Sequence, residues 1–277
     1  MEQIDLHIHT SASDGTLSPQ EVVSRAQAKG LKAVAITDHD TVRGIIPSEG
    51  PLEVIPGIEL SAEHEGKEIH VLGYFINPFS KELNDELKAV VDGRNQRNES
   101  IILRMAADGY MVSVVEINEK YPNAVIGRPH IAAELVEKGY APTIKHAFNE
   151  FLGQGRPYYL PRIYLPFDRA VELIRNAGGI SVLAHPMQYR YDESELLQLI
   201  VRLKEAGVWG LEAYHPSHLP EDTVKIRTVA EKFNMAITGG SDFHGGNLEG
   251  IDIGCMAVPA NILDSLKLAA GDNAGDA

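Results

Sequence analysis

The chain has 277 residues, of which 44% are hydrophobic, and its 39 acidic and 25 basic side chains give a formal charge of −14 at pH 7. This length predicts one large domain, or one domain carrying an insertion. The acidic balance argues against non-specific binding to duplex nucleic acid, which requires a basic face. A single cysteine, Cys255, excludes an internal disulfide framework and a zinc site built from several thiolates. No apolar run is long enough to span a membrane, and without a signal segment the expected location is the cytoplasm.

Short β-rich runs alternate with helical patterns over most of the chain. The first strand, residues 4–8, precedes a helix with Ser18 as its cap, then Pro19 and Glu21, and Gly30 as its stop. The other expected strands are residues 33–37, 52–60, 68–75, 180–184, 210–214 and 235–240, and further helical patterns occupy 167–177, 193–206 and 221–233. Seven strands with helical crossovers between most of them predict an α/β fold, with a parallel sheet closed into a (β/α) barrel. An open doubly wound sheet is the alternative.

The stretch from residue 80 to 159 breaks this alternation. It is helix-like and lacks clear strands, apart from a short β-rich run at residues 111–115. We therefore expect residues 1–79 and 160–277 to form the barrel. Residues 80–159 are expected to form a helical insertion subdomain over the end of the barrel that carries the active site.

His7 and His9 stand one residue apart in the first expected strand. Side chains alternate along a strand, so both imidazoles point to the same face. A lone histidine on such a face is more often a hydrogen-bonded core residue than a ligand, but packing gives no reason to place two costly polar rings side by side. A divalent cation does, because imidazole is one of its common nitrogen ligands.

Nearly every expected strand ends in residues that can bind metals. These residues are Asp38, His39, Asp40, Glu59, His70, His185, His215, His218, Asp242 and His244. Catalytic residues of (β/α) barrels gather at the carboxyl ends of the strands, because these ends meet at one mouth. The pattern therefore predicts a cluster of metal ligands at that mouth.

The motifs that carry these residues resemble the PHP (polymerase and histidinol phosphatase) family, a group of phosphoesterases among the amidohydrolase-like barrels. The motifs are DLHIHTSASDGTLSPQEVV, AITDHDT, GIELS, IHVLGY, VLAHP and GSDFH, in that order over almost the whole chain. RNQR and TDHDT are shared with the stand-alone branch that hydrolyses 3′,5′-nucleotide bisphosphates and 5′-phosphorylated short RNA. The resemblance implies a distorted (β/α)7 TIM-like barrel and two or three divalent ions of manganese, iron or zinc.

Carried over position by position, the resemblance also implies three sets of metal ligands. The first set is His7, His9, Glu59 and Asp242; the second is Glu59, His70 and His185; the third is Asp14, His39 and His244. Closely spaced metals can acidify a bridging water and neutralise the charge that grows on phosphoryl oxygens. The expected reaction is therefore attack of metal-activated hydroxide on a phosphate ester.

Several residues are candidates for contact with a substrate. Those that suit binding of phosphate are Arg94, Arg97, Arg128, His130 and His215. Guanidinium groups bind phosphate oxygens bidentately, although Arg94 and Arg97 could equally form a solvated helix face. Asp38 and His215 are the candidates for catalysis. Asp38 could orient a metal ligand or only cap a turn. His218 is the alternative to His215 as a proton donor.

More than one function is compatible with these residues. The favoured one is a metal-dependent phosphoesterase that acts on a small phosphorylated nucleotide or a short RNA. A histidinol-phosphate or other sugar-phosphate monoesterase is the alternative, and a non-catalytic PHP module is disfavoured because every ligand position is filled. We expect neither duplex nucleic acid nor a membrane as a partner, and the oligomeric state is left open.

Overall fold

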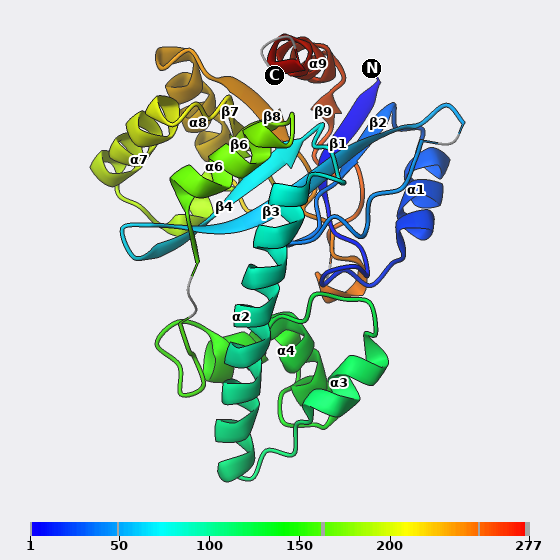
Figure 1. The fold of residues 1–277 in the computed structure, drawn as a ribbon, viewed down its shortest axis with the longest axis vertical. Helices are drawn as coiled ribbons and strands as arrows, with labels where there is room; N and C mark the ends of the chain where they lie inside the picture. The colour runs from blue at the N-terminus through cyan, green and yellow to red at the C-terminus, as the bar shows by residue number, and fades with distance from the viewer. Residues whose placement is uncertain (1, 49, 162–163, 249, 275–277) are drawn as a thin grey trace.

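The computed structural model describes residues 2–48, 50–161, 164–248 and 250–274 (Figure 1). Its strands form one curved sheet in the order β8-β7-β6-β4-β3-β2-β1-β9. The long strands are β1 (Gln3–Ile8), β2 (Ala33–Ile36), β3 (Glu53–His64), β4 (Lys67–Tyr74), β6 (Ile180–Leu183), β7 (Gly210–Tyr214) and β8 (Ala236–Gly239). Two-residue strands β5 (Leu165–Pro166) and β9 (Val258–Pro259) pair with β3 and β1. All seven strands predicted from the sequence are present.

The sheet closes where the segment after β8 meets β1. Ile8 forms a parallel bridge with Phe243, and the backbone nitrogen of His9 donates to the carbonyl of Phe243 at 2.9 Å. Gly240 allows this approach, because a Cβ there would lie 2.4 Å from the backbone nitrogen of His7. The architecture is thus the predicted α/β TIM-like barrel, nearly closed and distorted.

The distortion comes from β4, which runs antiparallel to both of its neighbours, β3 and β6. The expectation of a fully parallel sheet is therefore wrong at this strand. The reason is the connection between β3 and β4, a two-residue turn in which Glu65 and Gly66 both have positive φ. Such a turn joins antiparallel strands and is far too short for the crossover that a parallel pair needs.

Helices cover the outside of the barrel and one of its ends. The outer helices are α1 (Pro19–Ala28), α6 (Phe167–Asn176), α7 (Glu193–Glu205) and α8 (Pro220–Lys232). The predicted capping box of α1 is present, with the Ser18 side chain accepting from Glu21 N–H and the Glu21 side chain accepting from Ser18 N–H. The last helix, α9 (Asn261–Ala274), shares one buried cluster with the sheet, which includes Ile262 and Leu266 of the helix, Ile4 of β1 and Ile180 of β6. No helix in the described ranges is long and apolar enough to cross a bilayer.

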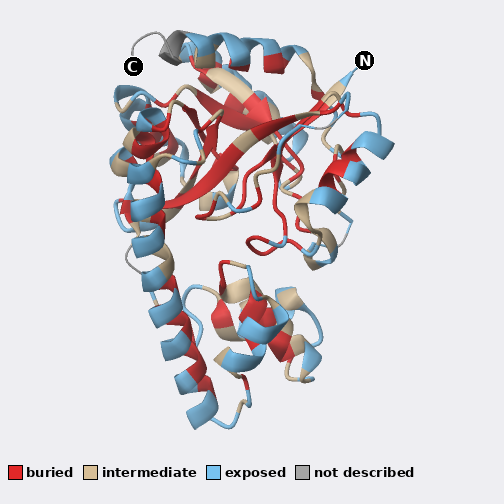
Figure 2. Cartoon of the chain, turned by 45° about the vertical axis from the view of Figure 1, so that its right-hand side comes forward, coloured by how far each residue is buried: buried red, intermediate tan, exposed pale blue. Residues whose placement is uncertain are grey.

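A group of helices lies at the end of the molecule opposite to α9 (Figure 1). It consists of α2 (Lys81–Ala107), α3 (Val114–Lys120), α4 (Arg128–Glu137), α5 (Ile144–Ala147) and a π-helical turn (Phe148–Leu152). Its own buried cluster includes Ile101, Met105, Ile131 and Leu135, and Figure 2 shows buried residues along one side of the long helix α2. The helical character predicted for this stretch is present, and residues 80–159 remain our proposed bounds for the insertion.

The β-rich run at residues 111–115 is not a strand. Residues 111–113 have no regular secondary structure, and Val114 starts α3. The Ser113 side chain caps this helix by accepting a hydrogen bond from the backbone nitrogen of Glu116. Capping by serine therefore overrides the strand preference of the neighbouring valines.

Candidate metal centre

The metal-binding candidates predicted from the sequence lie together at the carboxyl ends of the parallel strands, except that Glu59 and His70 lie within β3 and β4. His7 and His9 come from β1 and its end, and His39 follows β2, where it pairs with Glu59 of β3. Two residues arrive from the far side of the sheet, His185 after β6 and Asp242 after β8. Residues from both ends of the chain, from His7 to His244, thus share one buried site.

One group of ligand atoms surrounds Oε2 of Glu59. His7 Nε2 and His9 Nε2 lie 3.4 Å and 3.2 Å from this oxygen. Asp242 Oδ1 lies 3.4 Å from His7 Nε2 and 3.3 Å from His9 Nε2. The atoms of His7, His9 and Glu59 are close enough together to hold one divalent ion, and Asp242 Oδ1 lies beside both histidines.

The second oxygen of Glu59 faces two further imidazoles. Oε1 lies 2.9 Å from His70 Nδ1 and 2.9 Å from His185 Nε2. A carboxylate with ligands on each of its two oxygens can bridge two ions, because each oxygen serves one of them. Glu59, which is fully buried, has the placement that this role requires.

A third group gathers around Asp14. His244 Nε2 lies 3.3 Å from Asp14 Oδ1, and His39 Nε2 lies 3.9 Å from Asp14 Oδ2. The other ring nitrogen of His39, Nδ1, is 3.0 Å from Glu59 Oε2. His39 therefore lies between this group and the Glu59 groups, so that all nine predicted ligands form one continuous cluster.

The donor set fits divalent ions, because its buried atoms lack other partners. Within the described residues, the buried side-chain atoms without a hydrogen bond include six of this cluster: His7 Nε2, His9 Nε2, Asp14 Oδ1, His39 Nδ1, Glu59 Oε2 and His185 Nδ1. An unpaired buried polar atom costs free energy unless a ligand satisfies it. Five of these six atoms point into the groups described above, where cations would satisfy them.

The pKa values of the metal-free site show how its charges balance. Burial alone would raise the pKa of Glu59, but attraction to His39 and His70 holds it well below its usual range. Burial lowers the pKa of His9, but the carboxylates of Asp242 and Glu59, 3.3 Å and 3.2 Å from its Nε2, outweigh burial and raise the value to about 10. For His70, Coulombic attraction to Glu59 outweighs burial and also gives a pKa of about 10. Imidazolium protons thus neutralise the carboxylates, and a dication can take their place.

Glu212, in the middle of β7, was not predicted from the sequence. Its fully buried carboxylate accepts from His7 Nδ1 at 2.9 Å and from the backbone nitrogen of His185 at 2.7 Å. Because Nδ1 of His7 donates this bond, Nε2 is the nitrogen that can bind a cation beside Glu59. The only signal was an acidic residue within an otherwise apolar strand, GLEAY.

Asp38 is hydrogen-bonded to the loop between His9 and Asp14. Its Oδ1 accepts from Thr10 N at 2.7 Å and from Ser13 Oγ at 2.6 Å, and its Oδ2 accepts from Thr10 Oγ1 at 2.7 Å. These bonds fix the loop that carries Asp14. Since the carboxylate is buried and occupied, its contacts favour the role of orienting a ligand over direct catalysis.

His215 and His218 differ in their placement. The backbone nitrogen of Ser217 donates to Nδ1 of His215 at 3.1 Å, so Nε2 holds the proton, 3.2 Å from Asp242 Oδ2. His218 donates from Nδ1 to the carbonyl of Ala213 at 3.1 Å, and its buried Nε2 has no hydrogen-bond partner. Of the two rings, His215 is the one whose nitrogen lies beside a predicted metal ligand, Asp242, among the described residues.

The arginines line a cavity of about 110 Å³ between the barrel and the insertion. Its lining residues are Asp14, His39, Ser61, Glu68, His70, Arg94, Arg97, Arg128, Pro129 and Phe148. Arg128 is partly exposed, 3.4 Å from Glu68, with its guanidinium 5.4 Å from the ring centre of Tyr159. Arg97 is buried and donates to Asn98 Oδ1 at 2.9 Å.

The remaining candidate, His130, is buried. Its Nδ1 accepts from the backbone nitrogen of Gly127 at 3.0 Å, and its ring packs edge-on against Tyr121. These contacts shape the turn that precedes α4 and carries Arg128. They do not favour the predicted role in binding phosphate.

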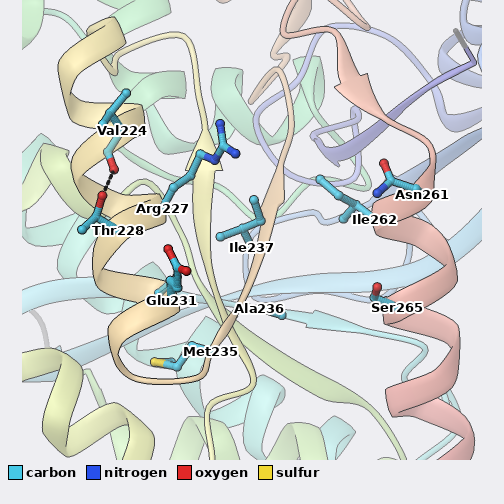
Figure 3. Close-up of a pocket in the computed structure, with 11 residues that line it drawn as sticks. Val224, Arg227, Thr228, Glu231, Met235, Ala236, Ile237, Asn261, Ile262 and Ser265 are labelled. Atoms are coloured by element: carbon cyan, nitrogen blue, oxygen red, sulfur yellow. Dashed lines mark hydrogen bonds between the residues drawn. The ribbon is translucent and has the colours of Figure 1, made fainter.

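A larger cavity of about 590 Å³ lies elsewhere, between α8, β8 and α9 (Figure 3). Its lining includes Arg227, Glu231, Asn261 and Ser265 but no histidine. A single carboxylate cannot form a polynuclear metal site. This cavity is therefore not the candidate centre.

Comparison with known proteins decides the family. Residues 5–177 match the PHP domain. The chain belongs to the PHP domain family. A 3′,5′-nucleoside bisphosphate phosphatase from Chromobacterium violaceum is 31% identical to this PHP protein over 260 residues, covering 92% of this chain and 91% of the relative. The 5′-3′ exoribonuclease Rnm of Escherichia coli is 31% identical over 247 residues, covering 87% of this chain and 84% of the relative.

Solved structures agree with this membership. A candidate metal-dependent phosphoesterase from Bifidobacterium adolescentis superposes with a TM-score of 0.87 at 27% identity, covering 97% of this chain and 96% of that one. A Chromobacterium violaceum protein described as an amidohydrolase, with bound sulfate and no metal, gives a TM-score of 0.83 at 29% identity and covers 96% of both chains. The PHP protein described here is therefore a metal-dependent phosphoesterase with a barrel fold.

Proposed function

We propose that this phosphoesterase hydrolyses phosphate esters of small nucleotides, either 3′,5′-nucleoside bisphosphates or the 5′-phosphorylated ends of short RNA. The observation that carries the proposal is Glu59, whose two oxygens each face two or more imidazoles at 2.9–3.4 Å. Such a bridging carboxylate suits a site with more than one ion. Relatives named for nucleoside bisphosphates and for RNA support the substrate class.

The ligand sets support two or three ions. His7, His9, Glu59 and Asp242 would hold one ion; Glu59, His70 and His185 would hold a second; Asp14, His39 and His244 would complete the third. When bound, divalent ions supply Lewis-acid stabilisation of phosphoryl oxygens and lower the pKa of bound water. Histidine and carboxylate ligands accept manganese, iron or zinc, and we propose manganese for the assay because mixed nitrogen and oxygen ligands suit it.

The side chains around the ions have distinct tasks in this proposal. Arg128, partly exposed at the cavity, binds phosphate oxygens that lie away from the reacting group. His215 keeps a proton on Nε2 beside Asp242, where it can donate to an oxygen of the substrate. Glu212 and Asp38 hold His7 and the Asp14 loop in place. Hydrogen bonds from fixed partners of this kind orient ligands before substrate arrives.

The test is hydrolysis by the whole chain supplied with manganese, followed as inorganic phosphate released from a phosphomonoester and as 5′-mononucleotide released from the dinucleotide. Substrates are adenosine 3′,5′-bisphosphate, a 5′-phosphorylated dinucleotide and histidinol phosphate. We expect both nucleotides to be turned over with at least about a hundredfold higher kcat/KM than histidinol phosphate, which is well within the discrimination that polar contacts to a substrate can give. A preference for histidinol phosphate would overturn the nucleotide assignment and favour the sugar-phosphate alternative.

A pair of histidine variants provides the control. His7→Ala removes a ligand from the cluster, whereas His146→Ala changes an exposed ring on α5. Loss of activity in the first variant alone would support the cluster as the reaction site. Wild-type activity in His7→Ala with metal still bound would rule it out.

A further inference from the structure

Arg94, in the middle of α2, is nearly buried and pairs with Asp40 of the barrel. One of its terminal nitrogens bonds to Asp40 Oδ2 and also lies 3.3 Å from Ser61 Oγ. The insertion helix is thereby joined to the ends of two barrel segments, the loop after β2 and strand β3. The side chain of Arg94 is 9% exposed and that of Asp40 is fully buried, so water screens the charges of this pair very little.

Asp40 lies between two predicted metal ligands. It follows His39 directly, and its backbone nitrogen donates to the carbonyl of Glu59 at 3.0 Å. Its carboxylate accepts from Ser61 N at 2.9 Å and from Ser61 Oγ at 3.1 Å, two residues beyond Glu59. The backbone of Asp40 has φ 52°, a left-handed conformation that only firm local bonding maintains in a non-glycine residue. The position of Asp40 therefore fixes His39 relative to Glu59.

Arg94 also contacts the start of α4. A Cβ on Gly127 would lie 3.0 Å from Arg94 Nη1, which places the guanidinium against the turn before Arg128. One side chain thus touches both the loop that holds His39 and the turn that presents Arg128. A shift of Arg94 would move these two parts of the site relative to each other.

The two arginine–carboxylate pairs at the cavity differ in how easily a substrate could take the arginine. Arg128 has an 18% exposed side chain and a long contact of 3.4 Å to Glu68, which is itself 28% exposed. Taking Arg94 would leave the buried carboxylate of Asp40 with its hydrogen bonds from Ser61 but without the cation that pairs with it. Breaking a buried pair in this way typically costs about 3–5 kcal/mol. A phosphate group can therefore bind Arg128 at little cost, whereas binding Arg94 would require breaking the buried pair with Asp40.

We propose that Arg94 is a positioning residue, which locks the helical insertion to the His39 loop through Asp40 and does not bind substrate. Its catalytic readout rests on the proposed function. Its structural readout, the mobility of the two joined segments in metal-free protein, does not, so the two proposals can fail separately.

The first experiment is hydrogen–deuterium exchange of the whole chain after treatment with a chelator. Arg94→Met and Asp40→Asn are compared with Arg104→Met, which makes the same change on an exposed residue of the same helix. We expect exchange in residues 38–43 and 122–130 to be roughly tenfold faster or more in the first two variants, given the cost of breaking a buried pair. Arg104→Met should match the wild type. Unchanged exchange in Arg94→Met or in Asp40→Asn would overturn the proposal.

The second experiment separates positioning from substrate binding by steady-state kinetics. If Arg94 positions the site, Arg94→Met and Asp40→Asn both lower kcat, up to about a hundredfold for a displaced site, and the double variant is no worse than the poorer single one. If Arg94 binds substrate, Asp40→Asn frees it and leaves or improves KM, while Arg94→Met raises KM alone. That second pattern would overturn the proposal. Should Arg94→Met fail to fold, Arg94→Lys, which keeps the charge but loses the planar fork, enters the same comparison.

Discussion

Replacing Glu212 with glutamine tests whether a buried carboxylate outside the ligand sets controls the metal centre. Glu212 accepts two hydrogen bonds, from His7 Nδ1 and from the backbone nitrogen of His185. A glutamine side chain has one oxygen and one NH₂ group, so it can accept from one of these donors and must present its own donor to the other. Either the bond from His185 N remains and the amide NH₂ faces His7 Nδ1, which can accept only with the ring proton moved to Nε2, or the bond from His185 N is lost. The negative charge is lost in both cases.

The expected loss of metal affinity in Glu212→Gln follows from the role of Glu212 in orienting His7. Removing the hydrogen-bond partner of a metal-ligating histidine typically weakens metal binding by about 10- to 100-fold, or about 1.4–2.7 kcal/mol. The His7 ring then lacks the bond that holds its Nε2 towards Glu59. We therefore expect a lower affinity for the ion and a matching loss in kcat/KM.

The assay is competition for manganese with a fluorescent chelator, run beside phosphate release. The matched control is Glu231→Gln, an exposed glutamate at the distant cavity of Figure 3. Glu231→Gln should leave both quantities unchanged. If Glu212→Gln kept the manganese affinity of the wild type within twofold, the reasoning that His7 is an oriented ligand would be refuted.

Three further predictions follow from the site. Asp242→Asn should reduce kcat by at least about a thousandfold, since it removes an anionic ligand, while circular dichroism shows an intact fold. Binding of manganese at pH 7.5 should release protons from His9 and His70, because their pKa values of about 10 in the metal-free protein favour the charged rings. Metal affinity should therefore rise with pH up to about 10. Calorimetry in buffers of different ionisation enthalpy measures the proton release, and equal heats in all buffers would contradict it. Arg128→Ala should raise KM for a nucleoside bisphosphate by about 10- to 100-fold, as expected for a lost charge-assisted hydrogen bond, and should affect a simple aryl phosphate less; equal effects would remove Arg128 from the specificity contacts.

The same pKa shifts bear on the stability of the metal-free protein. Because His9 and His70 titrate near 10 when folded and near 6.5 when unfolded, their contribution is fully present below about pH 6.5 and is lost as the pH rises towards 10. Metal binding acts in the opposite direction, because ions bind the deprotonated rings of the folded state. Above about pH 6.5 neither the metal-bound folded state nor the unfolded state binds these protons, so alkaline pH should destabilise the metal-free protein and leave the contribution of His9 and His70 to the metal-bound one unchanged.

The fold and the ligand cluster were predictable because they follow from periodicity. Alternation along β1 puts His7 and His9 on one face, and the convergence of strand ends brings in residues such as His185 and Asp242 from distant segments. The direction of β4 was missed because its sequence reads as a strand in either direction. What decides the direction is the short turn at Glu65–Gly66, which joins β3 to β4 without room for a crossover.

The partners that orient the ligands were harder to predict for a different reason. Glu212 sits in an apolar strand where a buried carboxylate is normally unfavourable, and only the three-dimensional approach of His7 explains it. Arg94 was predicted to face a substrate or solvent, because sequence spacing on α2 does not reveal that Asp40 lies opposite. Pairwise contacts between distant segments have no periodic signature, so they appear only in the structure.

Backbone strain gives an independent view of the same site. Asp40, His185 and Asp242 all have positive φ, at 52°, 24° and 50°, and each follows the end of a parallel strand. Non-glycine residues in this region cost about 1–3 kcal/mol each and persist where surrounding contacts over-determine them. For Asp40 those contacts are Ser61 and Arg94, and for His185 they include the bond from its backbone nitrogen to Glu212. The strain therefore falls where ligands must be aimed at a common point, and the residues that support it are those whose replacement we expect to disturb metal binding without touching the metal.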